Sequence, residues 1–559
     1  MKSWATKLLL LSFSMQCASQ IIETENFDTI CGHETHWDER GRLLGWYQPR
    51  IPGAAFDHVA RLASEFLLRI PDDPRTGMKM YLVTCCFQGP HMHAYPDEVA
   101  PGGIAPEDWM HNPACVNAGF VHSFALKYYQ YTGDDRFKSM VGQMLDYQLR
   151  NGTTPAHWIW ADVPYASSDP FEPVYAGATR WEEDGMRGDG LHGIEPDKVG
   201  ELGYAYLKYY QLSKEPKYLE ASIHCADALA GQVRSVNVDN SPLTITETVQ
   251  SPWPFRVNAE TGVIISEYCA NVLEPIKLFN ELLRLESDLG LLPGQAMAYR
   301  KARDFAWNWL YSKHGPLKTY IWSQYFEDVP NDPDRANRNQ VTPMELAKYL
   351  MENPGLDPRM DIHVPALVHW VLSTFGDPAI SAIREQTWCY ESMGSHSSRF
   401  GSTCAMWSEY TGYEKYKELA YRYLNYATYM TYDNGVVAVG HQWPSSWFSD
   451  GYGDYVRHFF DAMAAIPEWA PADENHLLRS SSVVQTIDYG DQKIELTCYD
   501  LAGTMRFRLI REPQRIIVNG VELSTTKSEY GYYTSEILDD HSAVIDLSYA
   551  SGNVIQIIL

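Results

Sequence analysis

Apolar residues recur with the spacing of amphipathic helices from about residue 55 to residue 471 of this chain. One example is the group Phe56, Val59, Ala60, Leu62 and Ala63. Short connections with Gly, Asp, Pro or Lys alternate with longer loops that are rich in Trp, Pro, His and Gly. This alternation predicts a ring of paired helices, with tight turns at one rim and functional loops at the other.

Three segments repeat one turn pattern, in which aromatic residues precede a short polar turn and another aromatic residue follows it. They are Tyr128–Gly133, Tyr209–Ser213 and Trp407–Gly412, and Leu278–Leu282 is a looser fourth copy. We interpret each segment as the tight turn of a helical hairpin. A repeated hairpin is the structural unit from which a toroid is built.

The repeated turn also aligns polar residues of the preceding helices. Counting back 14 and 11 residues from the equivalent position of each turn gives Asn117 and Phe120, Lys198 and Glu201, Tyr268 and Asn271, and His396 and Arg399. Because these positions are equally far from the turns, we expect their side chains to lie at one level of the ring. The sequence therefore predicts an active site at that level.

The pattern changes after residue 471, where short runs of β-branched residues replace the helical spacing. Asn519-Gly520 is a strong hairpin signal between two such runs. Residues 474–559 are therefore predicted to form a small antiparallel β-sandwich. Residues 20–54 show neither pattern, and we expect an irregular segment there.

Composition narrows the class of protein. A length of 559 residues favours one large domain with a smaller one, and 45% hydrophobic residues exclude global disorder. The net charge of −26 argues against nucleic acid as a partner, because phosphates are bound by an excess of Lys and Arg. The 13% of aromatic residues exceeds what a core alone requires and would suit an open cleft for flat, amphipathic ligands.

Residues 1–19 have the order of a secretory signal. Lys2 and Lys7 precede the apolar run Leu8–Phe13, and small residues follow it. This run is too short to span a bilayer, so we expect a secreted or periplasmic protein without membrane insertion. Anchoring as a lipoprotein through Cys17 is the weaker alternative.

The cysteine pattern argues against both a disulfide framework and a zinc site. Of the ten cysteines, removal of the signal takes away Cys17 and leaves an odd number, several of them in apolar helical segments, such as Cys225, Cys269 and Cys404. We expect buried free thiols. No Cys-x-x-Cys pair supplies a zinc framework.

The hairpin repeat, the C-terminal β-domain, the signal and the aromatic content together resemble the (α/α)-toroid carbohydrate-active enzymes, which comprise six-hairpin glycosidases and toroid polysaccharide lyases. This resemblance implies a mainly α fold, with an (α/α) toroid over residues 55–471 and a β-sandwich over residues 474–559. It also implies a polysaccharide or oligosaccharide substrate. The residues suggest no cofactor, although the acidic loops could hold a structural Ca²⁺.

The first hypothesis for the reaction is β-elimination on a uronic-acid-containing glycan. This reaction needs a group that neutralises the uronate carboxylate, a base for the C5 proton and an acid for the departing O4. Arg399 or Arg256, together with Asn117, would neutralise the carboxylate, while Tyr268 and His396 would divide the base and acid roles. An N-cap role for Asn117 and a structural salt bridge for Arg256 are the alternatives.

Further candidates for substrate binding lie in the loops. Arg256 and Trp253 belong to one rigid aromatic segment, and Asp189 and His192 belong to a glycine-rich acidic segment. Asn271 lies at the level of the repeated polar positions. We expect these side chains to contact the sugar.

The second hypothesis is a glycoside hydrolase, which needs a pair of carboxylates. Glu201 would be one member, and Asp189, Asp450 or Asp454 the other. The third hypothesis is a glycan-binding protein without catalytic activity.

Overall fold

The structure is a computed structural model. It describes residues 27–70, 72, 76–79, 86–87, 112–169, 172–179, 188–236, 250–323, 337–387, 389–442, 446–447 and 452–559. The predicted signal at residues 1–19, with Cys17, and the candidate acid Asp450 lie outside these residues. Cys225, Cys269 and Cys404 are buried free thiols, as expected. Among the helices of the described ranges, none combines the length and apolar character needed to cross a membrane.

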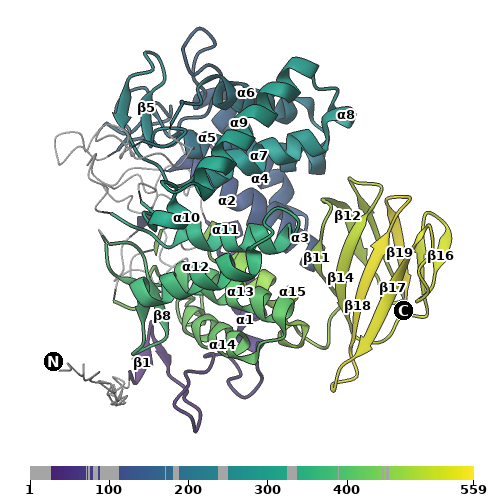
Figure 1. Cartoon of the computed structure of the whole chain (residues 1–559). Coiled ribbons are helices and arrows are strands. Elements are labelled where there is room, and N and C mark those ends of the chain that lie inside the picture. Colours follow the sequence, from purple (N-terminus) through teal and green to yellow (C-terminus); the bar gives the residue numbers. More distant parts are fainter. Residues whose placement is uncertain are drawn as a thin grey trace, which may run out of the picture.

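The described part of the chain contains six helical hairpins whose inner helices contact one another in turn, with the last against the first. This arrangement confirms the predicted (α/α) toroid, which Figure 1 shows from the side. The inner helices are α2 (Pro113–Phe120) with its continuations η3 (Val121–Tyr128) and α3 (Tyr129–Thr132), α5 (Pro196–Ser213), α7 (Leu273–Arg284), α11 (Val341–Glu352), α13 (Gly394–Thr411) and α15 (Val456–Ala465). Their outer partners, in the same order, are α4 (Arg136–Asn151), α6 (Pro216–Gly231), α9 (Pro293–Tyr311), α12 (Met360–Phe375), α14 (Glu414–Thr428) and α1 (Ala54–Arg69). The sixth hairpin thus pairs the first helix of the chain with the last helix of the ring.

Two glycines close the ring between α2 and the segment that leads into α15. A Cβ on Gly119 would lie 3.2 Å from the Cα of Gly453, so larger residues would force the two backbones apart. The Ser123 hydroxyl of η3 donates a hydrogen bond to the Gly453 carbonyl at the same contact. The first and last inner helices are therefore held side by side.

Short antiparallel sheets shape the loops between the hairpins. Their strands are β1 (Thr29–Ile30) with β2 (His33–Glu34), β3 (Cys86–Phe87) with β10 (Ser446–Trp447), β4 (Gly193–Ile194) with β5 (Arg256–Asn258) and β6 (Ile264–Ser266), and β7 (Gly376–Asp377) with β8 (Ala382–Arg384) and β9 (Ser392–Met393). The strands β4 and β9 lead directly into the inner helices α5 and α13. Two short helices, α8 (Glu286–Leu289) and α10 (Pro316–Thr319), lie in the remaining connections.

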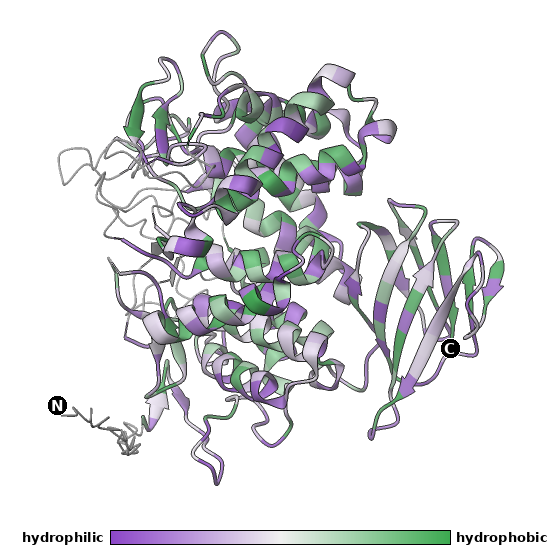
Figure 2. Cartoon of the chain, viewed as in Figure 1, coloured by the Kyte–Doolittle hydropathy of each residue, from purple (hydrophilic) through white to green (hydrophobic). Residues whose placement is uncertain are grey.

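The C-terminal domain consists of two antiparallel sheets packed face to face. One sheet contains β11 (His476–Ser480), β14 (Gly503–Leu509), β18 (Ala543–Tyr549) and β17 (Gly531–Ile537) in that order. The other contains β12 (Val484–Tyr489), β13 (Lys493–Cys498), β19 (Val554–Ile558), β15 (Arg515–Val518) and β16 (Val521–Leu523). Alternate residues of both sheets form one buried core, which is the expected pattern of a β-sandwich. Figure 2 shows hydrophilic and hydrophobic positions alternating along these strands and along the toroid helices.

The β-domain packs against the rim of the toroid that carries the short hairpin turns (Figure 1). The His476 ring stacks on Tyr131 of α3 at a centroid distance of 3.9 Å, and Arg284 of α7 forms an ion pair with Asp500 at 2.8 Å. Gln485 donates a hydrogen bond of 2.8 Å to the Gln211 carbonyl of α5. These contacts come from the C-terminal ends of three inner helices, so the β-domain covers that end of the ring.

Candidate active site

A cavity of about 1170 Å³ lies inside the ring and extends along the inner helices to the β-domain. On α5, its lining residues Lys198, Glu201, Tyr204 and Lys208 are three or four positions apart, which places them on one helix face. At a rise of 1.5 Å per residue, this face is about 15 Å long. The cavity therefore follows the axis of the toroid.

The two next inner helices present similar polar faces. The lining residues of α7 are Glu274, Lys277, Asn280, Glu281 and Arg284. Those of α11 include Thr342, Glu345, Lys348, Tyr349 and Glu352. Charged side chains in such numbers on the inward face of a ring need partners, because an unpaired buried charge is costly.

Acids and bases of these faces pair with one another. Lys277 Nζ lies 2.8 Å from Glu274 Oε1, and Lys208 Nζ lies 2.6 Å from Glu281 Oε1. Glu201 Oε2 is 3.3 Å from Lys198 Nζ, a looser contact. Glu201 therefore keeps more of its hydrogen-bonding capacity for a ligand than Glu281 does.

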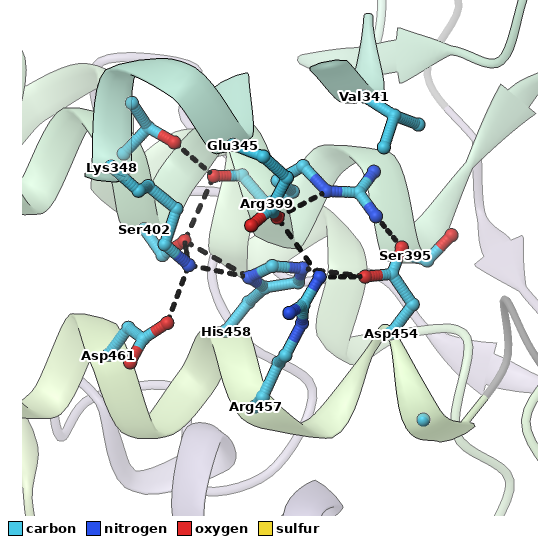
Figure 3. A network of polar contacts seen from close by, with 12 residues as sticks. Val341, Glu345, Lys348, Ser395, Arg399, Ser402, Asp454, Arg457, His458 and Asp461 are labelled. Carbon is cyan, nitrogen blue, oxygen red and sulfur yellow. Dashed lines mark hydrogen bonds and ion pairs between the residues drawn. The ribbon is translucent and has the colours of Figure 1, made fainter. Parts of the chain in front are cut away.

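A dense cluster of charges connects α11, α13 and α15 (Figure 3). Glu345 accepts hydrogen bonds from Arg399 Nε at 3.1 Å and from Arg457 Nη2 at 3.0 Å. Burial acts to raise the pKa of Glu345, but Arg457 and the nearby lysines outweigh it and hold the pKa well below its ordinary value. Glu345 is thus an ionised carboxylate whose lone pairs are largely occupied.

The same cluster contains a group of possible metal ligands. Atoms of Glu345, Asp454 and His458 lie within 4.8 Å of one another. However, Arg399 and Arg457 both form ion pairs with Glu345 and Asp454. The two guanidinium groups supply the positive charge that a cation would bring, so these residues do not fit a metal ion.

Glu274 and Glu201 are neighbouring carboxyl groups on adjacent inner helices. Burial raises the pKa of Glu274 above its ordinary value of 4.5; Lys277 opposes this shift, and the charge of Glu201 adds to it. Two neighbouring carboxyl groups, one of them with a raised pKa, can serve as an acid and a base.

A glycine allows the two helices that carry these carboxyl groups to approach closely. Gly200 precedes Glu201 and packs directly against the first turn of α7, where an added Cβ would lie 2.5 Å from Pro275 N and 2.9 Å from the carbonyl carbon of Glu274. Any side chain at position 200 would therefore push the start of α7 away from α5. The close approach of the two helices depends on this residue.

His122 of η3 and Tyr204 of α5 also face the cavity. Their rings are stacked at a centroid distance of 5.4 Å, and both line the cavity. Burial lowers the pKa of His122 well below its ordinary value of 6.5, and the nearby Arg457 and Lys277 add to the shift. His122 is therefore a neutral imidazole. It lies in the π-helical segment η3, and such segments are frequent at functional sites.

The structure brings four of the predicted catalytic and binding residues to the cavity, namely Arg399, Glu201, Asn271 and the alternative acid Asp454. Asn271 donates a hydrogen bond of 3.3 Å to Asp197. The remaining predicted catalytic residues are not among the described side chains that line the cavity. Their roles stay predictions.

These remaining residues have structural contacts. The Tyr268 hydroxyl donates to the Ile321 carbonyl at 2.9 Å, and Asn117 Nδ2 donates to Gln148 at 3.2 Å. His396 is fully buried, and its Nδ1 accepts a hydrogen bond of 2.9 Å from Arg399. His396 therefore orients an arginine that does line the cavity.

The predicted sugar-binding residues of the loops lie around the β4–β5–β6 sheet. Arg256 Nε is 3.1 Å from both Asp189 Oδ1 and Glu195 Oε1, and all three side chains are fully buried. These are the contacts of the structural salt bridge that was the alternative for Arg256. Asp189 thus has a cationic partner of its own, which does not favour its use in a Ca²⁺ site.

The other two loop candidates differ in exposure. Trp253 is buried and donates a hydrogen bond of 2.9 Å from Nε1 to the Leu229 carbonyl. His192 is partly exposed, lies 3.0 Å from Glu260 and contacts the Trp158 ring. Neither is among the described residues that line the cavity, and their contacts with a sugar stay predictions.

Sequence reasoning missed Glu274, His122 and Tyr204. The available signal was the recurrence of charged and polar residues at helical spacing, as in Lys198, Glu201, Tyr204 and Lys208. In an inner helix of a ring, such a face must point toward the axis. The repeated turn predicted how far along the helices the site lies, but it did not predict which side chains point toward the axis.

Comparisons with known proteins show likeness of overall shape. No protein-family model matches the sequence, and no curated protein matches it. Among solved structures, the chain is similar to a cellobiose 2-epimerase from Bacillus thermoamylovorans, with 10% identity over 73% of this chain and 98% of that chain, at a TM-score of 0.47. It is also similar to a D-mannose isomerase, with 9% identity over 74% of this chain and 96% of that chain, at a TM-score of 0.47. A third similar structure is an unsaturated glucuronyl hydrolase specific for heparin, with 12% identity over 74% of this chain and 96% of that chain, at a TM-score of 0.41.

Proposed function

We propose that this protein is an exported carbohydrate-active enzyme that hydrolyses a glycosidic bond of a polysaccharide or oligosaccharide. The observation that supports this proposal best is the pair of Glu274 and Glu201, which line one cavity from adjacent helices, with the pKa of Glu274 raised by burial and by the charge of Glu201, although Lys277 opposes this shift. Two carboxyl groups, one to act as the acid and one as the base, are the minimal equipment for glycoside hydrolysis. The polar cavity wall and its tyrosine rings suit a sugar.

In the proposed reaction, Glu274 is the general acid and Glu201 the general base. The Glu274 proton passes to the glycosidic oxygen as the bond between this oxygen and the anomeric carbon breaks. A water molecule forms the new bond to the anomeric carbon and gives one proton to Glu201. Glu345 remains ionised and paired, so it holds the cations of the cavity wall in place.

The proposal is tested with a panel of acidic and neutral glycans. We expect new reducing ends without ultraviolet absorbance, and loss of this activity in both Glu274→Gln and Glu201→Gln. The matched control is Glu536→Gln, because Glu536 is an exposed residue of β17 far from the cavity lining. Normal turnover by both cavity variants would refute the assignment.

The polysaccharide lyase remains the second candidate, and the pair of His122 and Tyr204 favours it. The neutral imidazole of His122 would take the C5 proton of a uronate, the electron pair would form the C4–C5 double bond, and the departing O4 would receive the Tyr204 proton. Arg399 lines the cavity, and a uronate carboxylate would compete there with its ion-pair partners Glu345 and Asp454.

This candidate makes its own prediction for the glycan panel. A lyase product absorbs ultraviolet light, and His122→Ala would abolish its formation. The predicted roles of Tyr268 and His396 are tested in the same assay, because Tyr268→Phe and His396→Ala would both leave turnover intact if these roles are wrong.

A further inference from the structure

The cavity has a solvent-exposed mouth at the seam between the toroid and the β-domain. We define this seam by four residues that line the cavity: Glu352 at the end of α11, Tyr410 at the end of α13, and Ala502 and Thr504 of the β-domain. Ala502 and Thr504 are exposed, and Tyr410 is 54% exposed. The mouth therefore lies at the rim of the short hairpin turns.

Tyr410 has the setting of a sugar-binding platform. Its ring is stacked on Trp407, with centroids 5.4 Å apart and planes inclined by 14°. This contact covers one face of the ring and fixes its direction while the side chain stays accessible. A rigid, amphipathic ring at the entrance of a polar cavity is suited to stack against the apolar face of a sugar.

The opposite end of the cavity lies at the first turns of the inner helices. Lys198 and Asn271 are almost completely buried there, and Glu274 belongs to the same level. From Arg284, near the seam, to Glu274, the lined face of α7 extends about 15 Å. A ligand that enters at the seam would thus reach the carboxyl pair only by running lengthwise along α7.

We propose that the substrate glycan enters through this seam with its chain end first, and that Tyr410 stacks on a sugar unit that follows the reacting one. This inference rests on the proposed function, and it predicts an exo-acting enzyme, because the chain end would be the first part of the glycan to reach Glu274. The β-domain is then one wall of the substrate path.

Two pairs of variants test the path. Ala502→Trp would fill the mouth, whereas Leu501→Trp adds the same ring to the neighbouring residue, which is 64% exposed and is not among the described lining residues. Tyr410→Ala removes the platform, and its control is Tyr413→Ala, because Tyr413 lies in the same turn and is 60% exposed. All four positions are surface sites, so each variant should unfold at the wild-type temperature.

The readout is kcat/KM on the glycan of highest turnover, together with the position of the first cleavage. We expect about a tenfold decrease for Tyr410→Ala and a larger one for Ala502→Trp, no change in either control, and release of products from one chain end only. Wild-type values for both test variants, or cleavage in mid-chain, would overturn the seam proposal.

Calorimetric measurements of oligosaccharide binding distinguish the seam proposal from the proposed function. Glu274→Gln, with and without Ala502→Trp, is titrated with the oligosaccharide of the panel that binds most tightly. Weaker binding with Ala502→Trp supports the seam even if hydrolysis is not the reaction. Equal binding contradicts the seam even if hydrolysis is confirmed.

Discussion

At the scale of single residues, the protonation state of Glu274 decides what the cavity can do. A carboxyl group whose pKa is raised in the folded state stays protonated above its ordinary value of 4.5 and loses its proton as the pH rises through the raised pKa. The contribution of this carboxyl group to folding stability is fully present at pH values below its ordinary pKa. This contribution is lost as the pH rises through the raised pKa. A carboxyl group with a raised pKa at this position therefore lowers the stability of the fold at neutral pH.

A pH profile follows from this sign. We expect kcat/KM to fall on the alkaline side as Glu274 ionises, and Glu274→Gln to lower kcat/KM by about 10²- to 10⁴-fold and to remove this limb. Thermal unfolding is measured alongside, because Glu274→Gln also removes the ion-pair partner of Lys277. An unchanged alkaline limb in the variant would show that another group is the acid.

The residue scale is also where prediction from the sequence was least complete. Counting back from the repeated turns gave Glu201, Asn271 and Arg399, which line the cavity, but also Tyr268 and His396, which do not appear in its described wall. The turn determines how far along a helix a residue lies. Which way its side chain points depends on how the helices pack around the ring, and local sequence does not encode that.

At the scale of elements, close packing of α5 on α7 sets the distance between the acid and the base. We expect Gly200→Ala to lower both kcat/KM and stability, because the new methyl group would collide with the backbone at Pro275 and displace Glu274. Gly294→Ala in α9 is the matched control, since an added Cβ there meets nothing within 4 Å. If the two variants behave alike in activity assays and denaturant unfolding, the packing does not position Glu274.

A second element-scale prediction concerns the loop sheet. Arg256→Ala would leave Asp189 and Glu195 buried without their shared guanidinium, and we expect a loss of about 3–5 kcal/mol in the free energy of unfolding. Denaturant unfolding measures this loss. A stable variant with a higher KM would instead support the predicted role of Arg256 in sugar binding.

The elements themselves were largely predictable. Helical spacing and the repeated turn predicted hairpins in a ring, and β-branched runs with Asn519-Gly520 predicted the sandwich; this turn, with φ of 45° and 81°, connects β15 to β16. The pairing of α1 with α15 was not predictable, because it joins the two ends of the ring. The π-helical segment η3 leaves no mark in the sequence that distinguishes it from an α-helix.

At the scale of the whole molecule, the β-domain is part of the cavity wall and not a detached appendage. Its position at the hairpin-turn rim comes from contacts such as His476 on Tyr131 and Arg284 with Asp500. These pairs are far apart in sequence. The chain as a whole has a net charge of −26. In the cavity wall, by contrast, acidic side chains form ion pairs with lysines and arginines.

In the proposed hydrolysis, Glu274 protonates the leaving group inside the toroid cavity. The decisive measurement is kcat/KM of Glu274→Gln on two substrates, the best glycan of the panel and an aryl glycoside of its terminal sugar with an activated leaving group. We expect a large loss on the glycan and near wild-type activity on the aryl glycoside, because a good leaving group needs no proton, while Glu201→Gln loses both activities. An equal loss on both substrates in Glu274→Gln, or an ultraviolet-absorbing product from the glycan, would contradict it.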